Sequence, residues 1–483
     1  MRKMLSLDEI TSAVSGKTVN KGLILNDVLF VSGVSKDTRT IEEGNLYVAI
    51  DGANFKGHDF CAQALEKGAA AVLVSDETKI PMGSIGIVVE DTVKALGDLA
   101  RLYRFKMNAK VICVTGSVGK TTTREMIAAA VGASKKVWST KFNENNEIGL
   151  PMTILSAPED SDVLVLELGM RLRGEISYLT NIACPDIAVI TNVGYSHIER
   201  LGSREEIRLA KTEIVEGLTE GGILVVNADD KFLFDYCRNN VPIGKGLAGV
   251  RLCDEGEAPG SGVTNCPVMI YGNNIEYGEG STFEAVATGI GFPSDIKVNL
   301  NINGKHNVRN ALFALICAHL TGADVASAVG ALEDYRDMKG RGQTIDTGRY
   351  IVINDAYNAA PESMEAAFFN LSVTGKGRRK VAVLGGMLEL GDWAAELHEN
   401  IGRDCGRYHF DKIFVTGDNR DDFVRGLLES DKDADYVLCS DTDDVRSKTE
   451  EYIADGDCIL FKASNAFGFE ALAKAFADKG DRA

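Results

Sequence analysis

Long apolar runs are missing from this sequence. No uninterrupted apolar stretch in its 483 residues reaches the roughly 18 residues that a membrane-spanning helix needs. The N-terminal stretch MRKMLSLDEITSAVSG carries charges inside it, so it predicts a short amphipathic helix and not a signal peptide. We therefore expect a cytoplasmic protein without a membrane span.

Paired cysteines are also missing. The 10 cysteines are scattered from Cys61 to Cys458, no two are spaced as C-x-x-C, and some stand in apolar stretches such as VICVT and GDCILF. This distribution predicts buried thiols in a reducing compartment, and it disfavours both a disulfide framework and a zinc site.

An excess of positive charge is absent as well. The chain has 52 Lys and Arg against 70 Asp and Glu, a formal net charge of −18. A surface this acidic repels a nucleic-acid backbone, which excludes a general nucleic-acid partner, while a small anionic substrate in a local basic pocket stays compatible. The apolar fraction of 45% and the charged fraction of 25% are those of a globular protein.

The chain is long enough for roughly two to four domains, and its pattern of strands and helices divides it into three. We place them at 1–107, 108–340 and 341–483. In the first, apolar strands at 45–50, 70–75 and 86–90 surround a helix at 59–68, which predicts a small α/β domain.

In the middle and last domains, buried strands alternate with amphipathic helices. This alternation predicts the α/β class, with a mostly parallel sheet flanked by helices in the middle and a Rossmann-like α/β fold at the end. Residues 245–300 are rich in glycine and predict an additional β-rich segment. The predicted strands are 110–115, 162–168, 186–193, 222–227, 350–355, 380–386, 412–417 and 457–464. The predicted helices are 120–131, 203–218, 307–322, 361–371, 394–406 and one at the C-terminal end.

The stretch VICVTGSVGKTTTREM at 111–126 has the order of a phosphate-binding loop, a strand followed by glycines and then a helix. Gly116 and Gly119 allow a tight turn whose N–H groups face an oxyanion. Lys120 can reach the β- and γ-phosphates, and the Thr121 hydroxyl can hold Mg²⁺. The usual motif has four residues between its glycines and this loop has two, so an ordinary strand-to-helix turn is the alternative.

Two further side chains follow strands of the same predicted sheet. Glu167 ends the strand at 162–168, and His197 follows the strand at 186–193. Ligands of open α/β sheets collect at the carboxyl ends of the strands. With Thr121, these two residues therefore predict a Mg²⁺ site, although either alone is also typical of a capping carboxylate or a loop histidine.

Several motifs in one order make the sequence resemble the Mur ligases along its whole length. They are SKDTRTIEEGNLYVAIDGANFKGHDF, TGSVGKTTT, NENNEIGLP, LELGM, TNVGYSHIERLGS with RLAKTEI, GKHNVRNALFA, NDAYNAAPESM and VLGGMLELG. The likeness is strongest to the members that add D-alanyl-D-alanine to UDP-N-acetylmuramoyl-tripeptide.

The resemblance implies an ATP-dependent ligase that forms an amide through an acyl phosphate. The products would be ADP, phosphate and UDP-N-acetylmuramoyl-pentapeptide, a peptidoglycan precursor for the cell wall. It implies a UDP-muramyl-binding first domain, an ATP-binding middle domain, and a last domain that closes on ATP and binds the dipeptide. We expect a monomer.

The resemblance also implies roles for individual residues. Lys120, Glu167, His197 and Lys211 would be catalytic, with two Mg²⁺ ions held by Thr121, Glu167, His197 and a carbamylated Lys211. From its own helix pattern, Lys211 would be a plain surface lysine. The implied nucleotide contacts are Gly116, Ser117, Val118, Gly119, Lys120, Thr121, Thr122, Asn307, Asn310, Arg341, Asp355, Tyr357 and Asn358. The implied UDP-muramyl-peptide contacts are Ser35, Asp37, Thr38, Arg39, Asn143, Asn145 and Asn146.

Four positions of the last domain depart from the family's usual motifs. Asn354 stands for an aspartate, Ala360 for an asparagine, Gly386 for an aspartate and Asn465 for an arginine. They bear on the identity of the second substrate. Two alternatives stay open: a sister Mur ligase or folylpolyglutamate-synthase-like enzyme that adds a different amino acid, and a nucleotide-binding regulator without catalysis.

Overall fold

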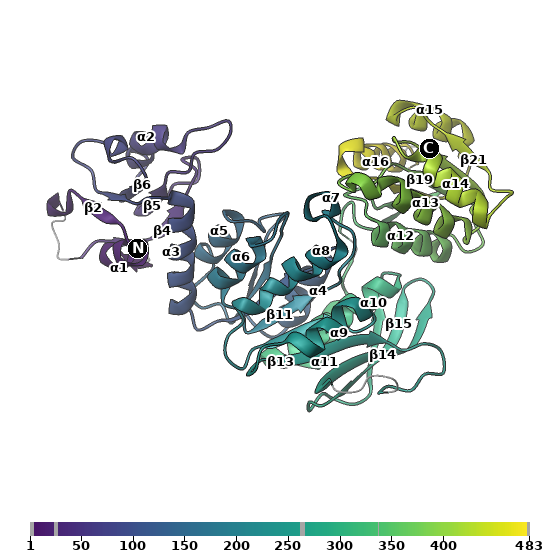
Figure 1. Cartoon of the computed structure of the whole chain (residues 1–483), viewed down its shortest axis with the longest axis horizontal. Coiled ribbons are helices and arrows are strands. Elements are labelled where there is room, and N and C mark those ends of the chain that lie inside the picture. The colour runs from purple at the N-terminus through teal and green to yellow at the C-terminus, as the bar shows by residue number, and fades with distance from the viewer. Residues whose placement is uncertain (1–3, 24–27, 261–265, 337, 481–483) are drawn as a thin grey trace.

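Three sheet-containing units follow one another along the molecule (Figure 1). The computed structural model describes residues 4–23, 28–260, 266–336 and 338–480. The first unit stands at one end, a central unit carries the largest sheet, and the third unit contains the C-terminal helices. Among the described residues, no helix is both long and apolar enough to cross a bilayer.

The first unit is a small sheet with one antiparallel edge strand. The order is β2-β7-β6-β5-β4, and β2 pairs antiparallel with β7 while the other pairs are parallel. Its strands are β2 (Lys17–Val19), β4 (Gly33–Ser35), β5 (Asn45–Val48), β6 (Ala71–Val74) and β7 (Gly86–Val88). A two-stranded ribbon joins β1 (Leu5–Ser6) to β3 (Phe30–Val31). The helices are α1 (Leu7–Ala13), α2 (Cys61–Glu66) and α3 (Thr92–Lys106).

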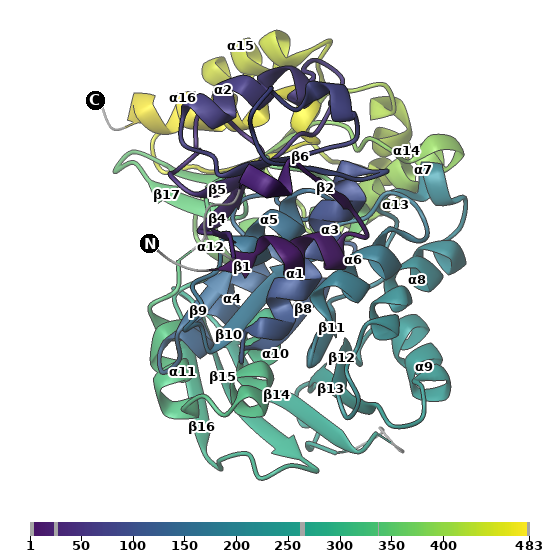
Figure 2. The ribbon, with the colours of Figure 1, turned by 90° about the vertical axis from the view of Figure 1, so that its left-hand side faces the viewer.

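Helix α3 joins the first unit to the central one, as Figure 2 shows from the side of the first unit. Its Tyr103 hydroxyl donates to the Ala157 carbonyl at 2.9 Å, and Arg104 Nε donates to the Ala183 carbonyl at 3.1 Å. Both side chains are buried, so these hydrogen bonds fasten α3 onto the central unit.

The central unit contains a nine-stranded sheet in the order β16-β15-β14-β13-β12-β11-β8-β10-β9. From β9 to β14 the neighbouring strands are parallel, and β14, β15 and β16 pair antiparallel. The strands are β8 (Lys110–Thr115), β9 (Val137–Ser139), β10 (Val163–Glu167), β11 (Ile187–Ile190), β12 (Ile223–Asn227), β13 (Gly246–Leu252), β14 (Val268–Tyr277), β15 (Ser281–Thr288) and β16 (Ile296–Leu300).

Alternate residues of the central strands face opposite sides of this sheet, as the two-residue period of a strand requires. Val111 and Cys113 belong to one core, and Ile112 and Val114 belong to the other. Each side is covered by helices, which is why these strands read as continuous apolar runs. The helices are α4 (Lys120–Gly132), α5 (Gly149–Leu155), α6 (Glu175–Ala183), α7 (Ile198–Leu201), α8 (Arg204–Thr212), α9 (Lys231–Asn240), α10 (Lys305–Thr321) and α11 (Val325–Glu333).

The third unit has a six-stranded sheet in the order β17-β18-β22-β19-β20-β21. All its pairs are parallel except β17 with β18. The strands are β17 (Gln343–Asp346), β18 (Ile351–Asn354), β19 (Lys380–Leu384), β20 (Lys412–Val415), β21 (Tyr436–Leu438) and β22 (Cys458–Lys462). The helices are α12 (Pro361–Thr374), α13 (Ala394–Gly406), α14 (Arg420–Ser430), α15 (Thr442–Tyr452) and α16 (Phe469–Gly480).

These observations confirm the predicted α/β class and the β-rich segment at 245–300. The predicted helix at 203–218 is wrong in its second half, because α8 ends at Thr212 and a 3₁₀ turn over Glu213–Glu216 follows. The predicted N-terminal helix is present as α1, and residues 1–3 of that stretch lie outside the described residues. All 10 cysteines are free, and all except Cys266 are buried.

Candidate active site

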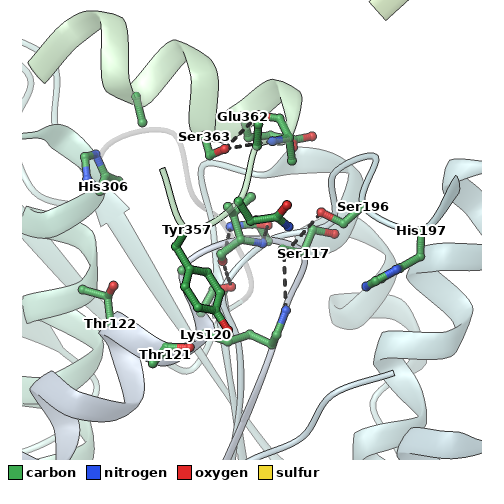
Figure 3. A pocket seen from close by; sticks show the side chains of 18 of the residues that line it. Ser117, Lys120, Thr121, Thr122, Ser196, His197, His306, Tyr357, Glu362 and Ser363 are labelled. Carbon is green, nitrogen blue, oxygen red and sulfur yellow. Dashed lines mark hydrogen bonds between the residues drawn. The ribbon is translucent and has the colours of Figure 1, made fainter. Parts of the chain in front are cut away.

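A cavity of about 1760 Å³ lies between the central and third units. Its central wall is formed by the loop between β8 and α4, the segments after β10 and β11, and the start of α10. Its third-unit wall is formed by residues near 341–342, 355–370, 388–390 and 462–466. In Figure 3, Ser117, Lys120 and Tyr357 lie between His306 and His197.

The loop after β8 has a conformation that requires glycine at both ends. Gly116 has φ +151°, and a Cβ there would overlap Thr191 Oγ1. Gly119 has φ +82° and is the N-cap of α4. Asn192 holds the turn between them, since its Oδ1 accepts from the Val118 N–H and its Nδ2 donates to the Val118 carbonyl, each at 3.0 Å. The loop is therefore braced from the end of β11 and points helix N–H groups into the cavity.

Lys120 is turned back onto its own loop. Its Nζ donates to the carbonyls of Gly116 at 2.8 Å and Ser117 at 3.3 Å. Burial lowers the pKa of Lys120; the nearby Glu167 carboxylate opposes this shift and Arg341 adds to it. An anion bound in the loop would give Lys120 Nζ a charged partner in place of the two carbonyls. It would thereby favour the protonated form of Lys120.

Glu167 is the last residue of β10, as the sequence predicts, and it is 2% exposed. Its Oε1 accepts from Asn145 Nδ2 at 2.9 Å. Its Oε2 has no hydrogen-bond partner among the described residues, and the nearest cation is Arg124 Nε at 3.7 Å. A buried carboxylate oxygen without a partner is an unsatisfied acceptor, which a cation would satisfy.

His197 follows β11 with φ +66° and lines the cavity where the central unit meets the third unit. Its Nδ1 is 2.8 Å from Glu389 Oε2. Burial lowers the pKa of His197, with the Lys120 and Lys211 charges acting in the same direction and Glu389 opposing them. The strands that precede His197 and carry Glu167 flank β8 on its two sides, so the phosphate-binding loop lies between them.

Lys211 is not a surface lysine. It lies in α8 and it is 1% exposed. Burial, with the charge of Lys120, holds the pKa of Lys211 well below its usual value, and Glu362 acts in the opposite direction. The alternative derived from the helix pattern alone is therefore wrong.

On the third-unit wall, two basic side chains lie against partners. The Arg341 guanidinium carbon is 4.0 Å from the centre of the Tyr357 ring. Lys462 Nζ is 2.7 Å from Asp355 Oδ2, and both groups are at the cavity. Burial nevertheless raises the pKa of Asp355, and the lysine only partly offsets the effect.

The start of α10 contributes amides and an imidazole. Asn310 Oδ1 accepts from the Thr123 hydroxyl at 3.0 Å, and Asn307 Nδ2 donates to the Asn303 carbonyl at 2.8 Å. Burial lowers the pKa of His306 to about 4, so this ring is neutral at physiological pH.

Most of the residues expected from the sequence line this cavity. They are Ser117, Val118, Gly119, Lys120, Thr121, Thr122, Asn143, Asn145, Asn146, Glu167, His197, Asn307, Asn310, Arg341, Asp355, Tyr357 and Asn358. Gly116 and Lys211 are not among the lining residues, although each interacts with Lys120. Of the four unusual positions, Ala360 and Asn465 line the cavity, while Asn354 and Gly386 do not.

The turn after β4 lies in the first unit, away from the cavity. Arg39 Nη2 is 2.6 Å from Asp37 Oδ2, Ser35 Oγ accepts from the Asp37 N–H at 3.1 Å, and Thr38 Oγ1 donates to Gln63 at 2.8 Å. The Arg39 guanidinium lowers the pKa of Asp37 to about 2. Arg39 would have to leave Asp37 before it could pair with another anion.

The seam between the units contains carboxylates that sequence reasoning did not find. Glu362 Oε1 accepts from the Tyr195 N–H at 3.0 Å, and a Cβ on Gly194 would overlap that carboxylate. With the His197–Glu389 contact, it joins α12 and the segment after β19 to the segment after β11. The motif NDAYNAAPESM contains Glu362, but a glutamate in a helix's first turn gives no sign of burial.

Among the described residues, no group of three or more His, Cys, Asp or Glu side chains is arranged to hold a metal ion by itself. The available donors are the Thr121 hydroxyl at the loop, the unpartnered Glu167 oxygen and the His197 ring. This donor set fits Mg²⁺ bound together with phosphates, because Mg²⁺ is usually held by one or two carboxylates plus substrate oxygens.

The family models and the curated relatives that match this chain are Mur ligases. The models "Mur ligase family, catalytic domain", "Mur ligase middle domain" and "Mur ligase, glutamate ligase domain" match residues 30–104, 114–318 and 340–465. The chain is 36% identical to UDP-N-acetylmuramoyl-tripeptide–D-alanyl-D-alanine ligase of Bacillus subtilis, over 94% of this chain and 95% of that one. It is 31% identical to the Escherichia coli protein of the same name, over 86% of each.

Solved structures of MurF are similar to this chain over nearly its whole length. The crystal structure of MurF from Acinetobacter baumannii superposes with a TM-score of 0.83 at 27% identity, covering 99% of this chain and 100% of that one. MurF ligase from Thermotoga maritima, solved in complex with ADP, gives a TM-score of 0.77 at 28% identity, over 93% and 98% of the two chains.

Proposed function

The chain belongs to the Mur ligase family, and from that premise we propose that it joins D-alanyl-D-alanine to UDP-N-acetylmuramoyl-tripeptide with cleavage of ATP. The observation that carries the proposal is the 36% identity, over almost the whole chain, to a ligase of that name. The cavity supports it, because loop amides, Lys120 and Arg341 are suited to polyanions in a protein of net charge −18.

The reaction has two steps. A carboxylate oxygen of the tripeptide attacks the γ-phosphorus, so that a new O–P bond forms and ADP leaves with the electrons of the broken bond. The dipeptide amine then attacks the acyl-phosphate carbon, a C–N bond forms, phosphate leaves, and the amine loses a proton. Two anions meet in the first step, and negative charge develops on oxygen and on the leaving phosphate in the second, so stabilising oxygen charge is the main task of the protein.

The central wall supplies the groups for the triphosphate. We assign the loop from Gly116 to Thr122 to the phosphates, with Lys120 turning from its loop carbonyls toward them. Asn307 and Asn310 would contact the nucleoside, and Arg341, Asp355, Tyr357 and Asn358 would approach from the third unit. Thr121, Glu167 and His197 would hold Mg²⁺, which supplies positive charge to the phosphate oxygens when it is bound.

We assign Lys211 as a carbamylated lysine. A buried amine whose pKa is lowered is more often neutral, and a neutral amine adds to carbon dioxide with loss of one proton. The product is an anion near Lys120, and it would pair with that ammonium or with a metal ion. The burial of Lys211 beside Lys120 supports this assignment.

The remaining assignments concern the substrates. Asn143, Asn145 and Asn146 would face the muramyl peptide, and the turn from Ser35 to Arg39 would hold the uridine diphosphate in the first unit. The third unit would receive the dipeptide. A cytoplasmic location and a monomeric state stay predictions.

One assay separates this function from the alternatives. Purified protein receives ATP, Mg²⁺ and UDP-N-acetylmuramoyl-tripeptide, with lysine or diaminopimelate as the third residue in separate reactions. Phosphate release is then measured with D-alanyl-D-alanine or with single amino acids. We expect release with the dipeptide alone and none from Lys120→Ala. Release with a single amino acid only would indicate a sister ligase, and nucleotide binding without any release would indicate a regulator.

A further inference from the structure

Arg124 is a buried cation whose place in the site is not explained by nucleotide contact. It lies in the second turn of α4, its side chain is 1% exposed, and it is not among the residues that line the cavity. Nη2 pairs with Glu125 Oε1 at 2.5 Å, while Nε and Nη1 have no hydrogen-bond partner among the described residues.

The carboxylate that faces Arg124 also has an oxygen without a hydrogen-bond partner. Glu167 Oε2 lies 3.7 Å from Arg124 Nε and is also without a hydrogen-bond partner in the described part of the chain. A separation of 3.7 Å is longer than a charge-assisted hydrogen bond but allows strong attraction in a buried setting. Two partly satisfied groups of opposite charge, one on α4 and one at the end of β10, therefore face each other.

Asn145 holds the other oxygen of the same carboxylate. Its Nδ2 donates to Glu167 Oε1 at 2.9 Å, and the Glu167 N–H donates to Thr140 Oγ1 at 3.0 Å. Each carboxylate oxygen has two lone-pair sites, so Asn145 engages one site on Oε1, while Oε2 faces Arg124 without a hydrogen bond and keeps its sites for a ligand.

We propose that Arg124 is a positioning residue that holds the Glu167 carboxylate correctly oriented for the Mg²⁺ of the bound nucleotide. This inference rests on the proposed function, because the ion in question accompanies ATP or ADP. Arg124 acts through Glu167: its guanidinium lies behind the cavity wall, out of reach of the ligand. Partners that orient metal ligands in this way commonly change metal affinity by about 10- to 100-fold when removed.

The test is the dependence of nucleotide binding on Mg²⁺. Calorimetric titration with ADP, with and without Mg²⁺, gives the factor by which the ion tightens binding. We expect Arg124→Met to lower that factor by about 10-fold or more and to leave ADP binding without Mg²⁺ unchanged. Arg124→Lys, which keeps the charge, should retain most of the factor.

A double-mutant cycle shows whether Arg124 acts through Glu167. Glu167→Gln alone should lower the Mg²⁺ factor, and adding Arg124→Met to it should lower it no further. Arg104→Met is the matched control, because Arg104 is also buried but lies on α3 and bonds to Ala183. It should reduce thermal stability and leave the Mg²⁺ factor intact.

The outcomes are distinguishable. A normal Mg²⁺ factor in Arg124→Met, or additive losses in the double variant, would overturn the inference and leave the proposed function standing. Failure of the unmodified protein to bind ADP at all would overturn the proposed function and this inference together. If Arg124→Met does not fold, Arg124→Gln carries the same expectation, since it removes the charge but keeps a donor.

Discussion

At the scale of single residues, Lys211 is the position where structure changes the interpretation most. Its sequence context, a helix with alternating charges, is typical of a solvated lysine, yet α8 turns it into the interior. Burying an ammonium beside another positive charge is unfavourable unless the group becomes neutral or is modified. The carbamate assignment follows from this conflict.

Replacing Lys211 tests the assignment. We expect Lys211→Ala to lower phosphate release by about 100-fold or more, because the anion that would pair with Lys120 or with a metal ion at the phosphates is lost. Short carboxylic acids such as formate or acetate should restore part of the rate by occupying the space. Lys376→Ala, at an exposed lysine, is the matched control and should keep full activity. Full activity of Lys211→Ala, or loss without any rescue, would contradict the carbamate.

At the scale of elements, the conformation of the loop between β8 and α4 depends strictly on its glycines, above all on Gly116. Gly116 has both a positive φ and Thr191 against its missing side chain, whereas many other glycines have only the first condition.

Gly116→Ala should therefore weaken ADP binding by about 10-fold or more and lower the free energy of unfolding by about 1–3 kcal/mol. Calorimetry and chemical unfolding measure the two effects. Gly83→Ala is the control, since Gly83 has φ +79° with nothing within 4 Å of an added Cβ. It should lose stability by about 1 kcal/mol and bind ADP normally. Equal ADP binding in both variants would show that the Gly116 conformation is not needed.

The sequence predicted those elements whose signal is local. Apolar runs identified β8, β10, β11 and β12, and the glycines with Lys120 identified the loop. Three-residue strands such as β2, β4 and β9 were not predicted, because their partly exposed residues have no distinguishable period. Helix α15 was missed because nearly all its residues are polar, whereas α14 was missed although its buried Phe423, Val424 and Leu427 have helical spacing.

The residues of the site divide in the same way, into those with a local sequence signal and those without one. Motifs located residues that face the cavity from strand ends, but the burial of Arg124 and Glu362 arises from contacts across units or layers. In the sequence, Arg124 is one more polar residue after three threonines, and nothing near it indicates Glu167, which lies on another strand. Such pairings are set by tertiary structure and have no signal in a local pattern.

At the scale of the whole molecule, the seam between the central and third units carries a carboxylate that is poorly compensated. Burial raises the pKa of Glu362 above its usual 4.5, although the N–H groups of Glu362 itself and Tyr195 partly oppose the shift. A carboxyl with a raised pKa in the folded state takes up a proton on folding. The stability it contributes is therefore lost as pH rises from 4.5 through the folded-state value.

Glu362→Gln should remove this loss of stability at higher pH while keeping an oxygen that accepts from the Tyr195 N–H. We expect it to raise the free energy of unfolding by about 1 kcal/mol at neutral pH and to have little effect below the usual glutamate pKa. Thermal unfolding at several pH values measures the difference. Glu365→Gln, one turn away and exposed, is the control. A lower stability of Glu362→Gln at neutral pH would mean that the anion is favourably paired.

The seam has a practical consequence for inhibition. Glu362 and Glu389 reach from the third unit to the segment after β11, so the pocket has two walls that belong to two different sheets. A compound that binds both walls would fix the distance between the central and third units, whichever substrate is present. It would need no likeness to a nucleotide or a peptide, and resistance to it would have to arise at the contact between the units.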